Sequence, residues 1–408
     1  MKIVIKINYL DSGMNKKILI VTEHFYPKDN STSYYITNIA KKLSENYHVK
    51  VICNTNIEKH NELDILNLSI ARVKEVKLNK NNILLRIFKF LLSSIKLVIV
   101  TNQNIKNQTQ VFSVTNPAFI IVFLAILKKY KKFNYTLLVY DVFPENLIAA
   151  KIFKKEAFLY KVVKRVYDWA YLKADRLIVI GRDMDEIIRK KTNNKVPIFL
   201  IQNWCDYNQI TSTHKCENII LKNLGIEDKK VFLFAGNLGR VQGIQNILKS
   251  AELVNNPDFV LLFIGDGAMK EDIQQHIKSS KMNNVVYAGY FPMDEQNVFL
   301  NACDVAIVSL ADSMYGLGVP SKSYFNMAAA KPILYIGDEK SEIARVVSEN
   351  NIGWIVEDGK VEKLAKLFSN LTVNDMDYAE FGMRARNVVK KYFSQEIILS
   401  KYEELYKK

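Results

Sequence analysis

The sequence predicts an α/β protein built from two doubly wound parallel-sheet domains in series. Its 408 residues exceed what one hydrophobic core usually covers. Short apolar runs alternate with stretches of helical periodicity, as expected for buried parallel strands joined by helices. This alternation starts again after a turn-like segment at residues 203–206. We therefore expect two βαβ-based domains.

The first domain is predicted to span residues 16–203, preceded by a tail at residues 1–15. A helix is expected at residues 34–45, between the first two strands, where apolar residues recur with helical spacing. The predicted strands of this domain are residues 18–22, 49–53, 111–115, 135–140, 176–180 and 197–201.

The second domain is predicted to span residues 204–390. Its expected strands are residues 231–235, 260–264, 285–288, 304–310 and 333–336. The remaining residues, 391–408, contain a predicted helix with Ser394 at its N-cap and Ile397, Ile398, Tyr402 and Leu405 on its apolar side. This helix either caps its own domain or crosses back to the first one.

Positive charge is concentrated in the first half. Residues 1–200 carry 34 Lys and Arg against 16 Asp and Glu, and the rest of the chain carries 23 against 26. Such an imbalance favours an anionic membrane or another polyanion as a partner of the first domain. We find no nucleic-acid recognition motif and expect no nucleic acid. No signal peptide opens the chain, so we expect a cytoplasmic protein.

Two apolar segments of the first domain, residues 83–100 and 118–127, are too short or too charged to span a bilayer. The second is followed by the basic run Lys128–Lys132. Either segment fits a helix lying on an anionic membrane surface or an ordinary core helix with a solvated basic end. Both interpretations remain open, and the first would make the protein peripheral on the inner face of the plasma membrane.

Three glycine-bearing turns follow predicted strands of the second domain. The first contains Gly236, Gly239, Arg240 and Gly243, and the helix predicted from Ile244 offers free backbone N–H groups to an anion. A second turn, residues 265–267, and a third, residues 316–322, follow later strands, and the third ends at Ser321 and Lys322. Each alone fits a plain strand-to-helix turn. Together at one sheet edge they predict a cradle for a nucleoside diphosphate.

These turns, with the motifs at residues 263–267 and 318–333, resemble the donor-binding half of glycosyltransferase family 4, in its bacterial surface-polysaccharide branch. Residues 18–27, 115–118, 140–147 and 202–206 extend the likeness over the first half. The family consists of retaining enzymes with the GT-B fold, two Rossmann-like domains facing across a cleft. The resemblance implies a nucleotide-sugar donor bound by the second domain and an acceptor presented by the first.

The resemblance also implies roles for individual residues. Arg240 and Lys322 would neutralise the leaving diphosphate, so they count as catalytic candidates, and no metal or other cofactor is required. The implied donor-binding residues are Gly236, Asn237, Gly239, Gln242, Gly243, Gly265, Asp266, Gly267, Gly318, Ser321 and Asn326.

The chain departs from the family pattern at several positions. Gln242 stands where a Lys is usual, and Asn237 where an Arg often follows the first glycine. Two glutamates seven residues apart are absent, and the second would align near Phe325. A Gly-Gly loop after the first strand is replaced by residues 31–33, Ser-Thr-Ser.

Several carboxylates near predicted strand ends are further candidates. Asp141 and Glu145 would orient an acceptor hydroxyl or act as general base, or else be a strand-end cap and a solvated helix residue. His24 is similarly placed at the end of the first strand. Asp183 and Asp185 have the spacing of a metal-binding pair, but acids are favourable at a helix N-terminus, and we expect capping.

The expected function is transfer of a sugar, an N-acetylated hexose or a deoxyhexose, from a nucleoside diphosphate to a lipid-linked saccharide in capsule, O-antigen or related polysaccharide synthesis. Two alternatives remain. A nucleotide-sugar epimerase would share the two-domain layout, and a non-catalytic nucleotide-sugar-binding protein would have lost activity with the acidic pair.

Overall fold

The computed structural model describes residues 17–28, 30–55, 63–75, 83–106, 109–280, 282–373 and 376–407. The predicted tail at residues 1–15 lies outside these ranges. Within them, contacts divide the chain into two compact units: the described residues up to Leu138 with Ala170–Arg176, and Val139–Trp169 with the described residues from Leu177 onward.

The first sheet has seven strands in the described residues, in the order β3-β2-β1-β4-β5-β6-β7. The neighbours from β3 to β5 pair in parallel, as do β6 and β7. The strands are β1 (Lys17–Thr22), β2 (His48–Thr55), β3 (Leu68–Lys74), β4 (Gln110–Val114), β5 (Asn134–Val139), β6 (Arg176–Val179) and β7 (Ile198–Leu200). The helices between them are α1 (Ser31–Ser44), α2 (Ile83–Asn104), α3 (Ile120–Tyr130), α4 (Glu145–Ala149), α5 (Phe158–Tyr171) and α6 (Arg182–Thr192).

The second sheet has six parallel strands in the described residues, in the order β10-β9-β8-β11-β12-β13. They are β8 (Lys230–Ala235), β9 (Phe259–Ile264), β10 (Val285–Tyr287), β11 (Val305–Ser309), β12 (Ile333–Ile336) and β13 (Gly353–Val356). The helices are α7 (Ile219–Leu224), α8 (Ile244–Glu252), α9 (Lys270–Ser279), α10 (Gln296–Leu300), α11 (Lys322–Ala328), α12 (Glu342–Asn350), α13 (Val361–Val373), α14 (Tyr378–Tyr392) and α15 (Gln395–Lys407).

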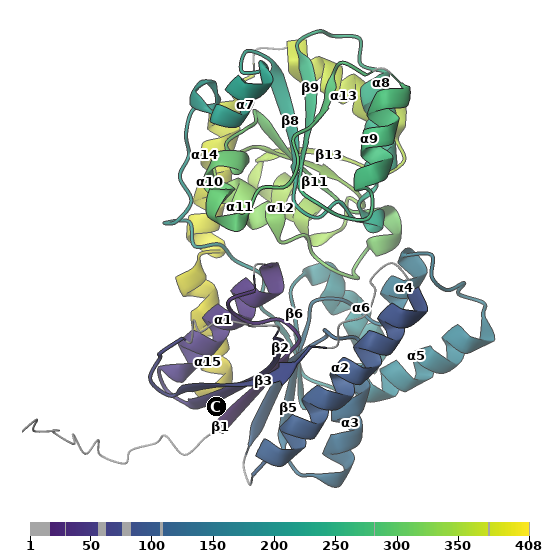
Figure 1. Cartoon of the computed structure of the whole chain (residues 1–408), viewed down its shortest axis with the longest axis vertical. Helices are drawn as coiled ribbons and strands as arrows, with labels where there is room; N and C mark the ends of the chain where they lie inside the picture. The colour runs from purple at the N-terminus through teal and green to yellow at the C-terminus, as the bar shows by residue number, and fades with distance from the viewer. Residues whose placement is uncertain are drawn as a thin grey trace, which may run out of the picture. The chain divides into compact units, whose positions relative to one another are not determined.

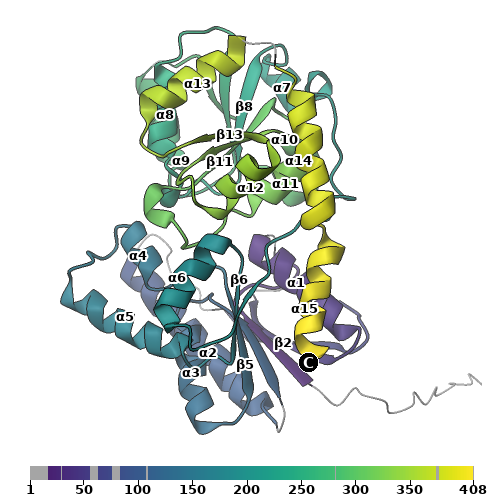
Figure 2. The same ribbon diagram turned by 180° about the vertical axis from the view of Figure 1, so that it is seen from behind.

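Alternating residues of the central strand β8 pack on opposite faces of the second sheet. Val231 and Leu233 belong to one hydrophobic cluster, and Phe232 and Phe234 belong to the other. Helices α11, α12 and α14 contribute to the first cluster, and α8, α9 and α13 to the second, so that helices cover both faces (Figures 1 and 2). Because both faces are buried, the strand is apolar throughout, which explains the continuous run in the sequence.

The predicted two-sheet α/β architecture is confirmed, but two strands were missed. β3 reads Leu-Ser-Ile-Ala-Arg-Val-Lys and is only partly buried, and β13 follows directly on α12. Both are edge strands. β3 alternates apolar with polar residues, whereas β13, Gly-Trp-Ile-Val, is a run of only four residues that is mostly half-buried. In α15, Tyr402 and Leu405 are buried as predicted, whereas Ile397 is exposed. Tyr402 packs edge-on against Trp204, with ring centroids 6.0 Å apart.

Candidate active site

The first two glycine turns are joined by backbone hydrogen bonds. The N–H of Gly236 donates to the carbonyl of Ile264 over 2.9 Å, and the N–H of Leu238 donates to the carbonyl of Asp266, also over 2.9 Å. Gly265 has φ +136° and lies so close to Gly236 that a Cβ at position 265 would overlap the carbonyl oxygen of Gly236. The two turns are therefore one structural unit at the carboxyl ends of β8 and β9.

The end of β11 and the third turn that follows it are attached to the first turn from the other side. The N–H of Ala311 donates to the carbonyl of Val241 (2.9 Å), and the Ser309 hydroxyl donates to the carbonyl of Gln242 (2.7 Å). The ammonium of Lys322 donates to Oε1 of Gln242 over 3.1 Å. The structure thus brings all three predicted turns together, because β9, β8 and β11 are neighbours in the sheet.

Lys322 occupies an unusual environment for a cation. Its Nζ lies 3.3 Å from the centre of the Phe234 ring, and no Asp or Glu pairs with it in the described part of the chain. Burial lowers the pKa of its ammonium well below the ordinary value. A desolvated amine with only a ring face and one amide oxygen as partners is poised to bind an anion, because a nearby negative charge favours the protonated form of an amine.

The other groups of the first turn supply hydrogen-bond donors. Arg240 and Asn237 are exposed, and neither Arg240 nor Lys322 is tied up in an ion pair within the described ranges. Gly243 adopts a left-handed conformation (φ +61°) at the start of α8, whose first backbone N–H groups lack helical partners. The guanidinium, amide and N–H donors of this turn, which contacts Lys322 through Gln242, are suited to phosphate oxygens.

Of the two predicted carboxylates, the structure places only Asp141 at these turns. A Cβ at Gly318 would lie 3.6 Å from an Asp141 carboxylate oxygen, and the N–H of Val142 donates to the carbonyl of Leu317 over 3.0 Å. Glu145 is instead bound by Lys164 (3.0 Å) and Lys191 (2.9 Å). Glu145 therefore has a structural position, whereas Asp141 lies beside Gly318 of the third turn.

The remaining predicted donor-binding residues differ in exposure and contacts. Ser321 precedes α11 without capping it, so that its hydroxyl remains available to a ligand. Asp266 is exposed and lies 3.8 Å from Lys270. Asn326 is only 1% exposed, and its Oδ1 accepts no hydrogen bond from the described residues. Asn326 is thus a buried residue of α11, not an open group of the turn.

Three residues at the site were missed by the sequence analysis. Phe234 presents its ring to Lys322, Ser309 binds the Gln242 carbonyl, and Asp358 receives a hydrogen bond from Asn246 of α8 over 2.7 Å. Each stands at or just after the end of a strand: β8, β11 and β13 respectively. That position is the signal that could have identified Phe234 and Ser309, whereas Asp358 follows a strand that was itself missed.

His24, the candidate at the end of β1, lies in a charged cluster of the first unit. Its Nδ1 accepts a hydrogen bond from Lys28 Nζ (3.0 Å), and Glu23 beside it is largely buried. Burial, reinforced by Lys28, lowers the pKa of His24 to about 4. The imidazole is therefore neutral near pH 7.

Replacing His24 by Gln should flatten the acid side of the stability profile. The unfolded chain takes up a proton near pH 6.5, but the folded His24 does so only near pH 4, so folding stability is lost as the pH falls between these values. The loss is on the order of 2–3 kcal/mol and should be absent in H24Q, since Gln can still accept from Lys28. Urea unfolding at pH 7 and pH 4.5 measures it. An equal pH difference in both proteins would contradict the assignment.

Asp183 and Asp185 begin α6, as expected for acids at a helix N-terminus. Asp183 accepts from the N–H of Met184 (2.9 Å), and Asp185 pairs with Arg189 (2.7 Å). Burial raises the pKa of Asp183 to about 6. In the ranges that the structure describes, no three His, Cys, Asp or Glu side chains are grouped as around a metal ion.

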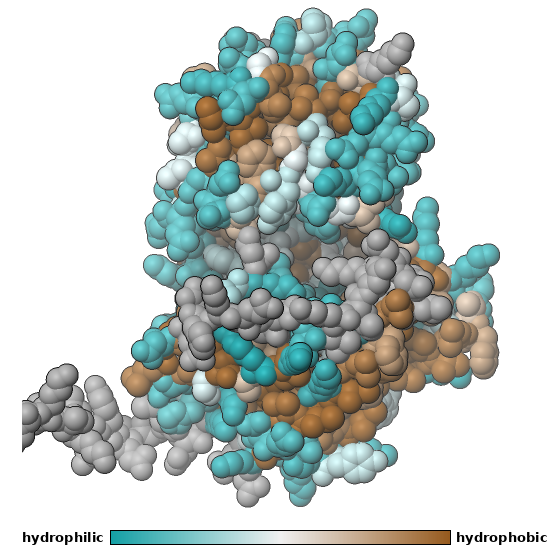
Figure 3. All heavy atoms as spheres, viewed as in Figure 1, coloured by the Kyte–Doolittle hydropathy of each residue, from teal (hydrophilic) through white to brown (hydrophobic). Residues whose placement is uncertain are grey.

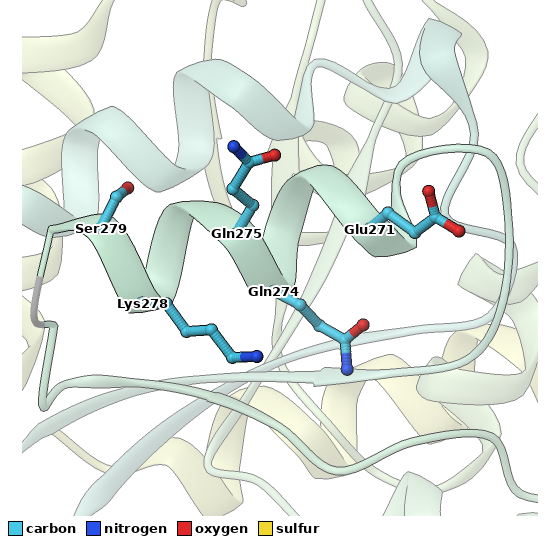
Figure 4. A pocket seen from close by; sticks show the side chains of 5 residues that line it. All are labelled: Glu271, Gln274, Gln275, Lys278 and Ser279. Carbon is cyan, nitrogen blue, oxygen red and sulfur yellow. The ribbon is translucent and has the colours of Figure 1, made fainter.

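A shallow hollow of about 530 Å³ lies elsewhere, on the outer side of α9. Figure 4 shows that its lining side chains, Glu271, Gln274, Gln275, Lys278 and Ser279, all come from this one helix. None of them belongs to the three turns, and their charges cancel. The hollow is a surface feature of α9 and is not the cradle formed by the turns.

Comparisons with known proteins identify the family of the chain. Residues 217–388, which contain all three turns, match the family model described as glycosyl transferases group 1. The chain is 34% identical over 391 residues to a Pseudomonas aeruginosa protein named probable glycosyltransferase WbjE, covering 95% of this chain and 96% of that protein. It is 20% identical over 229 residues to the putative colanic acid biosynthesis glycosyl transferase WcaI of Escherichia coli (strain K12), covering 54% of this chain and 56% of WcaI.

Among solved structures, Anabaena HepE in complex with UDP-glucose superposes with a TM-score of 0.71 at 16% identity, covering 95% of this chain and 98% of HepE. At that identity the likeness supports the fold, two Rossmann-like parallel-sheet domains. The family rests on the similarity to WbjE over nearly the whole length of both proteins. The chain belongs to the group 1 glycosyltransferases.

Proposed function

We propose that this protein is a retaining hexosyltransferase of the family 4 type. It moves a sugar, an N-acetylated hexose or a deoxyhexose, from a nucleoside diphosphate to a lipid-linked saccharide during capsule, O-antigen or related surface-polysaccharide synthesis. The main support for this proposal is that three glycine turns meet beside Lys322, a desolvated amine without a carboxylate partner in the described residues. HepE was solved in complex with UDP-glucose, which supports the donor class, and WcaI is named for colanic acid biosynthesis, which supports the pathway.

In this proposal the protein acts mainly on the leaving group. Negative charge builds on the diphosphate as the glycosidic bond breaks, and Lys322, Arg240 and the N–H groups at the start of α8 stabilise it. Asp141, beside Gly318, orients the acceptor hydroxyl. The departing phosphate takes the hydroxyl proton on the same face of the sugar, so that the anomeric configuration is retained. The protein cations carry the neutralisation, and no cofactor is part of the proposal.

The acceptor is placed at the inner face of the plasma membrane, with the protein as a peripheral component. None of the helices in the described ranges is long and apolar enough to cross a bilayer. Helix α2 exposes apolar side chains, with Phe88 50% and Ile99 51% accessible, as expected for an interfacial helix. Helix α3 buries Ile120 and Leu124 as a core helix does, and Lys128 after them pairs with Asp175.

A binding and transfer screen tests the function. Titration calorimetry with nucleoside diphosphates and their sugars should identify one base that binds, and the matching sugar nucleotide should be consumed with a lipid-linked acceptor. Nuclear magnetic resonance of the product should show the anomeric configuration of the donor. An inverted product would overturn the retaining mechanism, and absence of binding to every nucleotide would overturn the donor site.

Reactions without acceptor separate the proposal from its alternatives. A transferase leaves the sugar configuration of the donor unchanged under these conditions, apart from slow hydrolysis. Conversion of the donor into its epimer would identify an epimerase. Donor binding with no transfer to any lipid-linked acceptor would identify a binding protein.

A further inference from the structure

Helix α5 carries an exposed apolar stripe that the sequence analysis did not identify. Phe158, Leu159, Val162 and Val166 are 82%, 58%, 39% and 41% exposed. Positions 158, 162 and 166 are spaced four apart, so that they lie on one side of the helix, with position 159 beside them. Figure 3 shows hydrophobic side chains gathered over α5 on the surface of the molecule.

The opposite side of α5 holds the helix in place. Tyr160 and Tyr167 are buried there, and Tyr167 stacks on Phe143 with ring centroids 6.0 Å apart. Lys164 binds Asp168 (2.8 Å) on the same helix and Glu145 of α4 (3.0 Å). The stripe is therefore not needed to anchor the helix, and its exposure costs free energy unless a partner covers it.

Positive charge borders the stripe. Lys154 and Lys155 precede the helix, and Lys161 and Arg165 lie within it, beside the stripe. All four side chains are exposed, and none of them forms an ion pair with another described residue. Glu156 is the acidic residue exposed among them. Aromatic and aliphatic side chains beside Lys and Arg are typical of helices lying in the membrane interface, whereas lysines are depleted from protein interfaces.

We propose that α5 docks this protein on an anionic phospholipid bilayer. The apolar stripe enters the headgroup boundary, and Lys154, Lys155, Lys161 and Arg165 bind lipid phosphates. The inference deepens the proposed function and rests on it only for the location of the acceptor. It names a docking helix other than the two apolar segments that the sequence suggested.

Vesicle sedimentation tests the stripe. The protein should bind vesicles of phosphatidylglycerol and phosphatidylethanolamine more tightly than vesicles of phosphatidylcholine. F158S/L159S/V162S should bind at least tenfold more weakly, because its apolar contact area is lost. The matched control is L253S/Y290S, which changes exposed apolar residues of the second sheet domain (56% and 61% accessible) and should bind like the wild type. Equal binding of wild type and triple variant would overturn the proposal.

Charge substitutions test the basic border. Each cation near an anionic surface strengthens binding by roughly fivefold, so K154Q/K155Q/K161Q/R165Q should lose most affinity for anionic vesicles and much of its salt dependence. Equal affinity of the wild type for anionic and neutral vesicles would contradict the docking. Self-association that disappears in the triple variant, without vesicle binding, would assign the stripe to a second copy of the chain and also overturn the proposal.

A fluorescent label on α5 reports directly whether the stripe enters the bilayer. Cys53, Cys205 and Cys303 are buried and Cys216 is exposed, so a Cys216→Ser background lets one introduced thiol be labelled. The emission of a nitrobenzoxadiazole dye on Phe158→Cys should shift to the blue when anionic vesicles are added, and the emission of the same dye on Leu253→Cys should not. No shift at position 158 would sink the inference. Calorimetric binding of the nucleoside diphosphate, measured on the same proteins, tests the donor site independently, so failure of one proposal is distinguishable from failure of the other.

Discussion

Replacing Lys322 by Met should weaken binding of a nucleoside diphosphate by about 1.5–3 kcal/mol and slow sugar transfer by about 10²–10³-fold, without lowering the stability of the fold. The folded-state pKa of Lys322 lies below that of the unfolded chain, so the residue costs stability at neutral pH, where the unfolded chain carries the protonated amine. Met removes that cost and keeps a favourable sulfur contact with Phe234. Loss of binding together with an unchanged or higher unfolding free energy is the signature of a residue held for its ligand.

Two further variants sharpen this result. Lys322→Arg retains a cation and should recover part of the affinity. Arg240→Ala removes a cation that is exposed before the ligand binds, so it should weaken binding by less than K322M and leave stability unchanged within about 0.5 kcal/mol. Calorimetric titration and urea unfolding measure both quantities. If K322M bound the nucleoside diphosphate as tightly as the wild type, Lys322 would have to be removed from the site.

Much of the fold could be predicted because buried parallel strands appear in the sequence as uninterrupted runs of apolar residues. β8 and β9 are buried on both faces, and the predicted strands 231–235 and 260–264 agree with them to one residue at each end. β3 could not be found in that way, since polar residues interrupt its apolar positions and it is only partly buried, and β13 is short and begins with Gly353. The exposed stripe of α5 also escaped, because a helix with apolar residues on two sides and charges between them resembles an ordinary amphipathic helix.

The site divides along similar lines. Glycines at the ends of β8 and β9 predicted the turns, because ligand-binding turns follow the carboxyl ends of parallel strands. The environment of Lys322 could not be predicted, since it depends on how Phe234 and Gln242 pack around the ammonium. The sequence also could not show that Asp141 lies at the turns and Glu145 does not. Glu145 is neutralised by Lys191, 46 residues further on, and only the fold brings the two together.

Replacing Gly265 by Ala should have the largest effect on the fold of the donor site. With φ +136° the residue is in a conformation that side chains rarely adopt, and a Cβ would overlap the carbonyl oxygen of Gly236. Backbone strain contributes about 1–3 kcal/mol, and the overlap must be relieved by separating the two turns. We expect G265A to lose about 3 kcal/mol or more of unfolding free energy and to lose measurable binding of the nucleoside diphosphate.

Gly289→Ala is the matched control for the steric part of this effect. Gly289 also has a positive φ (+93°), and its carbonyl accepts the N–H of Gly265 over 2.8 Å, but a Cβ there would meet no atom within 4 Å. G289A should therefore show only the conformational cost, about 1–2 kcal/mol, and keep its affinity for the nucleotide. Urea unfolding and calorimetric titration of the two variants separate strain from overlap. If G265A and G289A lost the same unfolding free energy and the same affinity, the steric overlap at Gly265 would have no effect of its own. The close approach of Gly265 to Gly236 would then not be needed for the donor site.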